Sequence, residues 1–265
     1  MKTKIVGILV LMLLVTSAMS AMGIFVEQKS ITLYNPSTGG WIEEYDNFKI
    51  LHVNGSNYEM GYQHGLLLSE EMGENYRAFL SFTESNFGLD YDFYTWYWNE
   101  LKDNVPIEYK NELQGMSDGS GMSLINVSIL NIMADYFHCC GAAAWDSATT
   151  DGKMIHVRSF DWRSDMIDPV TGDHIRENQI LMVRNPDDGF ASLEPTFAGI
   201  IGGPGGINEN GIGCAVLVSY SWYENNITHA EGNPVIFRMK EILDQSTNAE
   251  EAVNIITSSE TTGWN

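Results

Sequence analysis

The stretch from Cys139 to Trp162 constrains the fold of this chain more than any other segment. Two cysteines open an apolar run of small residues, Thr150-Asp151-Gly152 supplies the residue types of a tight turn, and a second apolar run follows. This pattern predicts a β-hairpin. Arg158 and Asp161 lie on its return strand, so a thiol, a guanidinium and a carboxylate can meet around one pocket. Such a pocket suggests a nucleophilic enzyme, and we expect its thiol at a new N-terminus made by chain cleavage.

A thiol at the head of a mature chain carries its own base. Cysteine attacks as the thiolate, and its ordinary pKa of about 8.5 leaves only a small ionised fraction at neutral pH. A positive neighbour and a proton acceptor are therefore required. The α-amine of an N-terminal residue, with a pKa of about 7.7–8.0, suits the second role.

The beginning of the chain has the features of an export signal. Lys2 and Lys4 give a basic start, an apolar core follows from Ile5 to Val15, and Ala18-Met19-Ser20 offers small residues where a signal peptidase cuts. The apolar core is shorter than the roughly 20 residues of a membrane span. We therefore predict a signal peptide over residues 1–20 and a secreted or extracytoplasmic protein with no stable membrane insertion afterwards. An uncleaved N-terminal anchor is the alternative.

Composition and motif spacing remove several classes of function. The chain carries 14 basic and 35 acidic residues, a formal net charge of −21, so its surface repels nucleic acid. Its six histidines are scattered without the spacing of metal ligands, and the Gly202–Gly206 run lacks the lysine of a phosphate-binding loop. We therefore expect no metal, no cofactor and no nucleic-acid partner. The oligomeric state is open.

The three cysteines are too few for a disulfide scaffold. Because their number is odd, at least one thiol stays free or pairs between chains. Cys139 and Cys140 are adjacent, and neighbouring cysteines rarely bond to each other because the geometry is strained. Cys214 either pairs with one of them or is a buried, inert thiol.

Hydrophobic periodicity and turn signals predict an α+β fold built in layers. Gly61 and Gly65 lie on one face of the first predicted helix, which indicates that another element approaches closely there. Turns rich in glycine are expected at 117–121 and 202–206. The chain ends at Asn265 without a closing element, so we expect its last strands to be missing. The predicted helices span about 58–82, 91–101, 106–116, 123–136, 234–244 and 248–257, and the predicted strands span 142–145, 154–158, 179–185, 192–201 and 213–220.

Four motifs occur in order along the chain. They are Gly55-Ser-Asn-Tyr-Glu-Met-Gly61-Tyr-Gln-His-Gly65, the cysteine-led strand that ends at Trp145, Arg158-Ser-Phe-Asp161-Trp162, and Gly206-Ile-Asn208-Glu209-Asn-Gly211-Ile. In these motifs the chain, from about Leu51 to its end, resembles the isopenicillin N acyltransferase-like cysteine peptidase family of the N-terminal-nucleophile hydrolases. Choloylglycine hydrolases and phospholipase B-like proteins are more distantly similar. The resemblance implies a four-layer αββα sandwich, self-cleavage before the cysteine, and acyl chemistry on amides or thioesters. It also implies a small acylated molecule as the substrate.

The resemblance also selects the nucleophile. In the family a tryptophan lies six positions after the catalytic cysteine, and Trp145 lies six positions after Cys139, so Cys139 is selected and Cys140 is the alternative. His138 then precedes the cleavage point, where relatives often have glycine. Asn208 is expected to shape a turn, together with Asn210.

Arg158 and Asp161 match the Arg-x-x-Asp pair of the family. In this role Arg158 stabilises the thiolate and Asp161 accepts a hydrogen bond from the freed ammonium group. An ordinary ion pair at a strand end is the alternative. His156 lies on the same strand face as Arg158, as a supplementary base or as an ordinary solvent-facing or core histidine. Relatives supply a downstream asparagine as an oxyanion donor, and Asn265 takes that place in the pattern.

We therefore predict an exported precursor of an acidic hydrolase or acyltransferase, with a signal peptide over 1–20, a helix-rich pro-segment over 21–138 and an incomplete catalytic segment over 139–265. Cleavage between His138 and Cys139 frees the nucleophile, which attacks an amide carbonyl and forms an acyl-thioester. A phospholipase B-like lipid deacylase on the same fold is one alternative. A non-catalytic exported binding protein that keeps the fold is the other.

Overall fold

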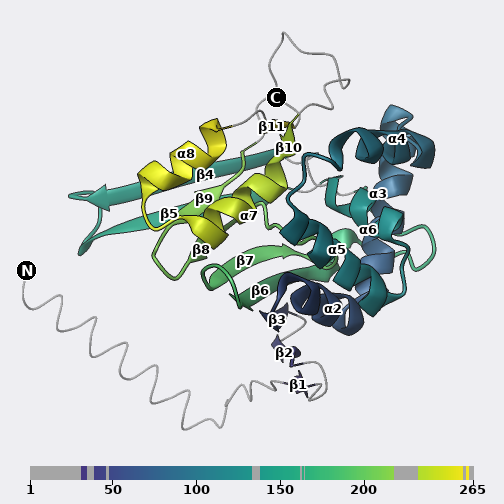
Figure 1. Cartoon of the computed structure of the whole chain (residues 1–265), viewed down its shortest axis with the longest axis horizontal. Coiled ribbons are helices and arrows are strands. Elements are labelled where there is room, and N and C mark those ends of the chain that lie inside the picture. The colour runs from purple at the N-terminus through teal and green to yellow at the C-terminus, as the bar shows by residue number, and fades with distance from the viewer. Residues whose placement is uncertain are drawn as a thin grey trace, which may run out of the picture. The chain divides into compact units, whose positions relative to one another are not determined.

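The structure is a computed structural model, and its described residues form helices and strands in separate layers (Figure 1). They confirm the α+β class, with seven α-helices, one seven-stranded sheet and two two-stranded sheets in the described part of the chain. The segment predicted as a signal peptide and Asn265 lie outside the described residues. Described are residues 31–34, 39–45, 48–132, 138–161, 163, 165–217, 232–258 and 261–262.

The main sheet takes strands from both sides of the predicted cleavage point. Its order is β1-β2-β3-β6-β7-β8-β9, with β3 and β6 parallel and the other neighbours antiparallel. The predicted pro-segment and the predicted catalytic segment therefore share one hydrogen-bonded sheet. The strands are β1 (Ile31–Tyr34), β2 (Trp41–Tyr45), β3 (Phe48–Gly55), β6 (Gln179–Pro186), β7 (Ser192–Phe197), β8 (Gly205–Asn208) and β9 (Gly213–Ala215).

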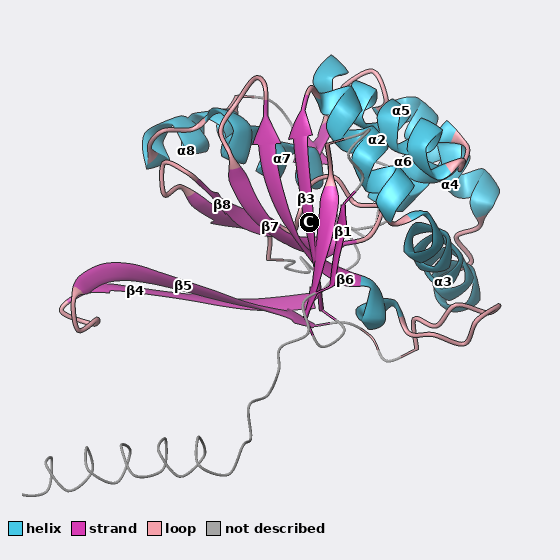
Figure 2. Cartoon of the chain, turned by 90° about the horizontal axis from the view of Figure 1, so that it is seen from below, coloured by secondary structure: helices cyan, strands magenta, loops and turns pink. Residues whose placement is uncertain are grey.

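Helices cover one face of this sheet, and a long hairpin lies on its other side (Figure 2). Alternate residues of a strand point to opposite faces. On β6, Ile180, Met182 and Arg184 are buried on the helix side, whereas Leu193 of β7 and Ile207 of β8 are exposed on the opposite face. The sheet thus has one buried face and one face with exposed apolar side chains.

The first predicted helix is two helices, α2 (Asn57–Leu67) and α3 (Ser69–Phe87). The backbone of Leu68 leaves the helical range, with φ −129° and ψ 30°, and the Leu68 side chain is buried in the core. Glu70 and Glu71 occupy the first turn of α3, where carboxylates interact favourably with the helix dipole. A continuous apolar pattern hides this break, because both helices bury their residues in the same core.

Helix α5 (Ile107–Ser120) packs against α2 through glycines on both helices. A Cβ atom on Gly61 would lie 2.0 Å from a backbone carbonyl oxygen of α5, and one on Gly65 would lie 2.3 Å from another. Gly115 and Gly119 of α5 meet α2 in the same way, at 2.0 and 2.2 Å. This contact confirms the close approach predicted at the first pair.

The other helices occur near their predicted positions, but the turn predicted at 117–121 is wrong. Helix α5 continues to Ser120, because the glycines near its end serve the contact with α2 rather than a turn. Ser123 accepts a hydrogen bond from the amide of Asn126, at 3.3 Å, at the start of α6. The remaining elements are α4 (Tyr91–Leu101), α6 (Leu124–Ile132), the 3-10 helix η2 (Ile175–Asn178), α7 (Val235–Gln245), α8 (Ala249–Thr257) and the parallel pair β10 (Asn233–Pro234) and β11 (Thr261–Thr262).

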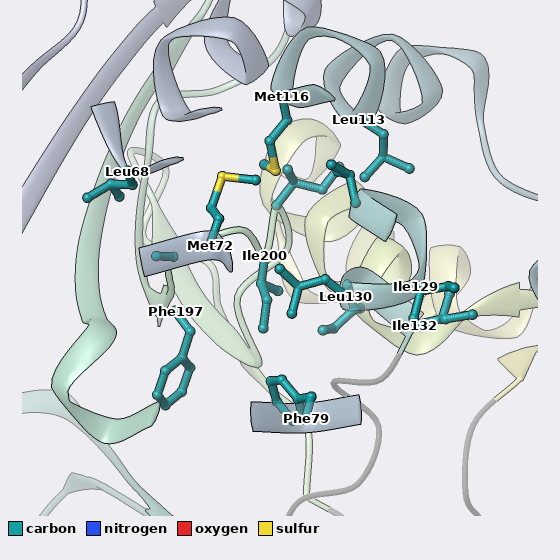
Figure 3. Close-up of a cluster of buried hydrophobic side chains, with 14 of the residues drawn as sticks. Leu68, Met72, Phe79, Leu113, Met116, Ile129, Leu130, Ile132, Phe197 and Ile200 are labelled. Atoms are coloured by element: carbon teal, nitrogen blue, oxygen red, sulfur yellow. The ribbon is translucent and has the colours of Figure 1, made fainter. Parts of the chain in front are cut away.

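A hydrophobic core lies between the helices and the buried face of the sheet (Figure 3). Met72 and Phe79 of α3, Met116 of α5, Leu130 of α6 and Phe197 of β7 contribute fully buried or nearly fully buried side chains. Residues before and after the predicted cleavage point therefore fill one common core.

The segment after β7 leaves the sheet and is buried, so the strand predicted over 192–201 is shorter than expected. Three helices supply partners for the backbone of residues 198–201. Asn75 donates to the carbonyl of the first residue at 2.8 Å, and His64 accepts from the amide of the second at 2.9 Å. Asn131 donates to the carbonyl of the second and accepts from the amide of the fourth. Buried backbone groups need such partners wherever no strand provides them.

Candidate active site

The predicted hairpin is present as strands β4 (His138–Asp146) and β5 (Gly152–Asp161). The two strands are antiparallel, and Cys139 lies opposite Phe160 while Cys140 lies opposite Ser159. His138, on the other side of the predicted cleavage point, lies opposite Asp161. The backbone register therefore brings the predicted nucleophile within two residues of both Arg158 and Asp161 on the neighbouring strand.

The side chains of Cys139, Cys140 and Asp161 lie outside what the structure describes, and so does Asn265 as a whole. Their predicted roles remain predictions. The structure does describe the side chain of Arg158, which is the group expected to stabilise the thiolate.

Arg158 is half-buried at the base of the hairpin. Its Nε and Nη2 atoms both donate to the carbonyl oxygen of Val216, at 3.0 and 2.8 Å. Val216 directly follows β9, and a Cβ atom on Gly141, which lies opposite Arg158, would come within 3.3 Å of a methyl group of Leu217. The chain after β9 thus contacts both strands of the hairpin and fixes the guanidinium.

Two other candidate groups have clear environments. His156 is exposed on β5, which agrees with the solvent-facing alternative. Cys214 is a free thiol whose Sγ atom lies 3.8 Å from the carbonyl oxygen of Met239. Burial, and then the neighbouring Glu194, raise the pKa of Cys214 to about 12. A thiol with that pKa is protonated at neutral pH, so Cys214 is a poor nucleophile.

The first motif of the family resemblance holds the fold together. Ser56 caps α2, and Gly61 and Gly65 meet α5. The side-chain amide of Gln63 accepts from the backbone amide of Asn54 at 2.9 Å and donates to its carbonyl at 2.8 Å, as a neighbouring strand would. His64 is fully buried against the segment after β7, and burial lowers its pKa to about 3. A histidine with that pKa stays neutral and accepts the hydrogen bond.

Asn208 shapes the turn between β8 and β9, as predicted. Its Nδ2 atom donates to the carbonyls of Leu243 and Ser246 at the end of α7, at 3.0 and 2.8 Å. Its Oδ1 atom accepts from the amides of Asn210 and Ile212. All hydrogen-bonding capacity of this amide serves the fold, so Asn208 is not available to a substrate oxyanion.

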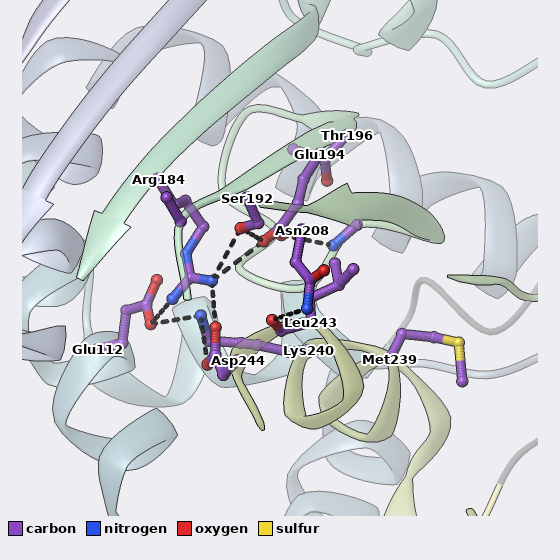
Figure 4. Close-up of polar contacts among 12 residues, drawn as sticks. Glu112, Arg184, Ser192, Glu194, Thr196, Asn208, Met239, Lys240, Leu243 and Asp244 are labelled. Atoms are coloured by element: carbon purple, nitrogen blue, oxygen red, sulfur yellow. Dashed lines mark hydrogen bonds and ion pairs between the residues drawn. The ribbon is translucent and has the colours of Figure 1, made fainter. Parts of the chain in front are cut away.

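A buried group of five charges lies between the sheet and helices α5 and α7 (Figure 4). Arg184 of β6 contacts Asp244 of α7 at 2.7 Å, Glu194 of β7 at 3.0 Å and Glu112 of α5 at 3.7 Å. Lys240 of α7 lies 3.0 Å from Glu112 and 3.7 Å from Asp244. Burial favours the neutral form of Asp244, but Lys240 and Arg184 outweigh burial and lower its pKa. We call these five residues the buried charge cluster.

This cluster was not expected from the sequence. Arg184 shares a strand face with the buried residues Ile180 and Met182. A charged residue at such a core position is the one sequence feature that could have indicated a buried ion pair. The partners come from three other elements, and no local pattern joins them.

Within the described ranges, no group of three or more histidine, cysteine or acidic side chains could hold a metal ion. Among the helices of those ranges, none combines the length and the apolarity needed to cross a bilayer.

No known family model matches this chain. The chain is 27% identical over 241 residues to protein dcd1B of Dictyostelium discoideum, covering 81% of this chain and 46% of that protein. Protein dcd1A of the same organism is 23% identical over 248 residues, covering 80% and 53%. An uncharacterized protein of Archaeoglobus fulgidus is 23% identical over 250 residues, covering 82% and 40%. The chain thus spans about half the length of the curated relatives it matches.

Proposed function

We propose that this chain is an exported, self-cleaving cysteine hydrolase or acyltransferase of the N-terminal-nucleophile type, similar to the isopenicillin N acyltransferase-like family. The register of the β4–β5 hairpin carries this proposal. It aligns the backbone of Cys139 with the strand that bears Arg158 and Asp161. The carbonyl of Val216 holds the guanidinium of Arg158 at the base of the hairpin.

In the proposed maturation the thiol of Cys139 adds to the carbonyl carbon of His138. The acyl group moves from nitrogen to sulfur, and water hydrolyses the resulting thioester. This sequence of steps leaves a carboxylate on His138 and a free α-amine on Cys139. The α-amine then accepts the thiol proton of Cys139, and Arg158 stabilises the thiolate.

In the proposed reaction the thiolate attacks the carbonyl carbon of an amide substrate. The C–N bond breaks, and the leaving amine takes a proton from the α-ammonium group of Cys139. Water then attacks the acyl-thioester, gives one proton to the α-amine and releases the acid. An amine acceptor in place of water makes the same step an acyl transfer.

The proposal includes a second sheet that begins with the hairpin. Leu193 and Ile207 are exposed on the outer face of the main sheet, and Ile155 and Val157 are exposed on one face of β5. An apolar sheet face of this kind is ordinarily buried by a further layer. Together with the helices, such a layer would extend the fold toward an αββα sandwich.

Trapping the acyl-enzyme tests the proposed chemistry. We expect the chain that starts at Cys139 to gain the mass of one acyl group when it is mixed with N-acyl aminocoumarins of short, medium and long chain and quenched in acid. Cys139→Ala should abolish the adduct, whereas Cys214→Ala should retain it, because Cys214 is half-buried and its pKa is raised. An adduct that persists in Cys139→Ala, or turnover of phospholipid esters without turnover of amides, would contradict the proposal.

A further inference from the structure

The turn predicted over 202–206 is shorter than expected, because Gly205 and Gly206 are the first residues of β8. We propose that this turn, residues 202–204, is a positioning element for Arg158, acting through the carbonyl group of Val216. The inference rests on the proposed function, because it assigns this turn a role beside the nucleophile Cys139. The turn has no charged side chain that could bind a phosphate. Its role in the fold is to hold Val216 in place.

Arg158 binds the backbone carbonyl of Val216. Two N–H groups of one guanidinium converge on a single carbonyl oxygen, at 3.0 and 2.8 Å. A guanidinium is planar, so two donors on one acceptor fix both the direction and the plane of the group. The position of the Val216 carbonyl is therefore one determinant of where the positive charge lies.

A hydrogen bond joins Val216 to the turn. β9 has only three residues, and Val216 lies just beyond it. The amide of Val216 donates to the carbonyl of Pro204 at 2.8 Å. This hydrogen bond anchors Val216 two covalent bonds from the carbonyl carbon whose oxygen holds Arg158. A displacement of Pro204 is thus passed on to the guanidinium.

The backbone of the turn and of the first residue of β8 packs closely against neighbouring backbone atoms. A Cβ atom on Gly203 would lie 2.8 Å from the carbonyl oxygen of Gly205 and 3.0 Å from that of Pro195. A Cβ atom on Gly205 would lie 2.6 Å from the carbonyl oxygen of Cys214. Backbone atoms cannot yield as a flexible side chain can, so only glycine permits this geometry.

The turn is also tied to the buried charge cluster. The amide of Gly203 donates to Oε2 of Glu194 at 3.4 Å, and Arg184 holds the other oxygen of that carboxylate at 3.0 Å. Glu194 is fully buried. The line of contacts therefore runs from the core through the turn and Val216 to the base of the hairpin.

The first test measures the hydrogen exchange of the Arg158 Nε–H group in ¹⁵N-arginine-labelled full-length protein. We expect slow exchange in the wild type and exchange at least tenfold faster in Gly203→Ala, which pushes on the turn. Pro204→Gly loosens the turn without a clash and should also accelerate exchange if Gly203→Ala does not fold. Gly65→Ala is the control, because it places a methyl group against a carbonyl in the distant α2–α5 contact.

The second test measures the pH profile of alkylation of Cys139 by iodoacetamide, read from its peptide mass. Gly203→Ala should move the profile to higher pH and slow alkylation at pH 7 about tenfold, as expected when a thiolate loses part of the stabilisation from a neighbouring cation. In an Arg158→Ala background the same change should have no further effect. A merely structural role of the turn would not produce this dependence on Arg158.

Two results would overturn the positioning role: equal Arg158 exchange in Gly203→Ala, Pro204→Gly and Gly65→Ala, or an alkylation shift that persists without Arg158. A different result separates the failure of the proposed function. If Arg158 exchange responds to the turn but Arg158→Ala leaves the alkylation profile of Cys139 unchanged, the turn positions Arg158 and Arg158 does not serve the thiol.

Discussion

Replacing Arg184 with alanine is expected to lower the free energy of unfolding by about 3–5 kcal/mol, the cost of removing one partner from a buried ion pair. The side chain of Arg184 is fully buried, and it contacts the carboxylates of Glu112, Glu194 and Asp244. Without it, Lys240 faces three buried carboxylates, and at least two of them must take up protons or admit water. Urea unfolding followed by tryptophan fluorescence measures the effect.

Arg176→Ala is the matched control for this substitution. Arg176 is exposed on η2, so the same change of residue removes the same charge from the surface. We expect an effect within about 0.5 kcal/mol for the control. A loss of stability in Arg184→Ala no larger than in Arg176→Ala would show that the buried charge cluster does not hold α5 and α7 to the sheet.

Adding one methyl group at Gly61 is expected to destabilise the protein by about 3 kcal/mol, at the upper end of the usual cost of overpacking. The new Cβ atom of Gly61→Ala would lie 2.0 Å from the carbonyl oxygen of Glu112. That oxygen belongs to the backbone of α5, so the two helices must separate. Their separation also moves the side chain of Glu112 away from the buried charge cluster. Thermal and urea unfolding of the purified variant measure the change.

Gly73→Ala is expected to stabilise the protein, in contrast to Gly61→Ala. Gly73 also lies inside a helix, but its Cβ atom would meet only the Nη1 atom of Arg77, at 3.2 Å, and not a backbone atom of another helix. The Nε and Nη2 atoms of Arg77 bind Asp168, so the Nη1 atom is the one that must shift slightly. Alanine in place of a helical glycine should then stabilise the protein by about 0.5–1 kcal/mol. Equal effects at the two positions would mean that the α2–α5 contact is not as close as described.

The sequence predicts the elements whose signals are local. The aromatic segment forms α4 at Tyr91–Leu101 as expected, and β6 begins at Gln179 as expected. The hairpin was predicted from a turn signal between two apolar runs, and its pairing is present. Gly61 and Gly65 predicted a close contact, because glycine destabilises a helix and is favoured there only where a neighbouring element leaves no room for a side chain.

Features that depend on distant parts of the chain were not predictable in this way. No proline or glycine adjoins the break at Leu68. The glycines of α5 are typical of a turn in the sequence, and only the position of α2 in the fold explains them as packing residues. In the site, one partner of Arg158 is the backbone carbonyl of Val216. Every residue carries such a carbonyl, so the residue type gives no signal. Only the tertiary fold brings it to the hairpin.

The central claim is that the peptide bond between His138 and Cys139 breaks. Intact-mass measurement of the purified full chain, with sequencing of each N-terminus, tests it most directly. We predict two polypeptides, one of which starts at Cys139, and a single uncleaved chain in Cys139→Ala. Cys214→Ala should cleave like the wild type. One uncleaved polypeptide in the wild type, identical in processing to Cys139→Ala, would contradict the account.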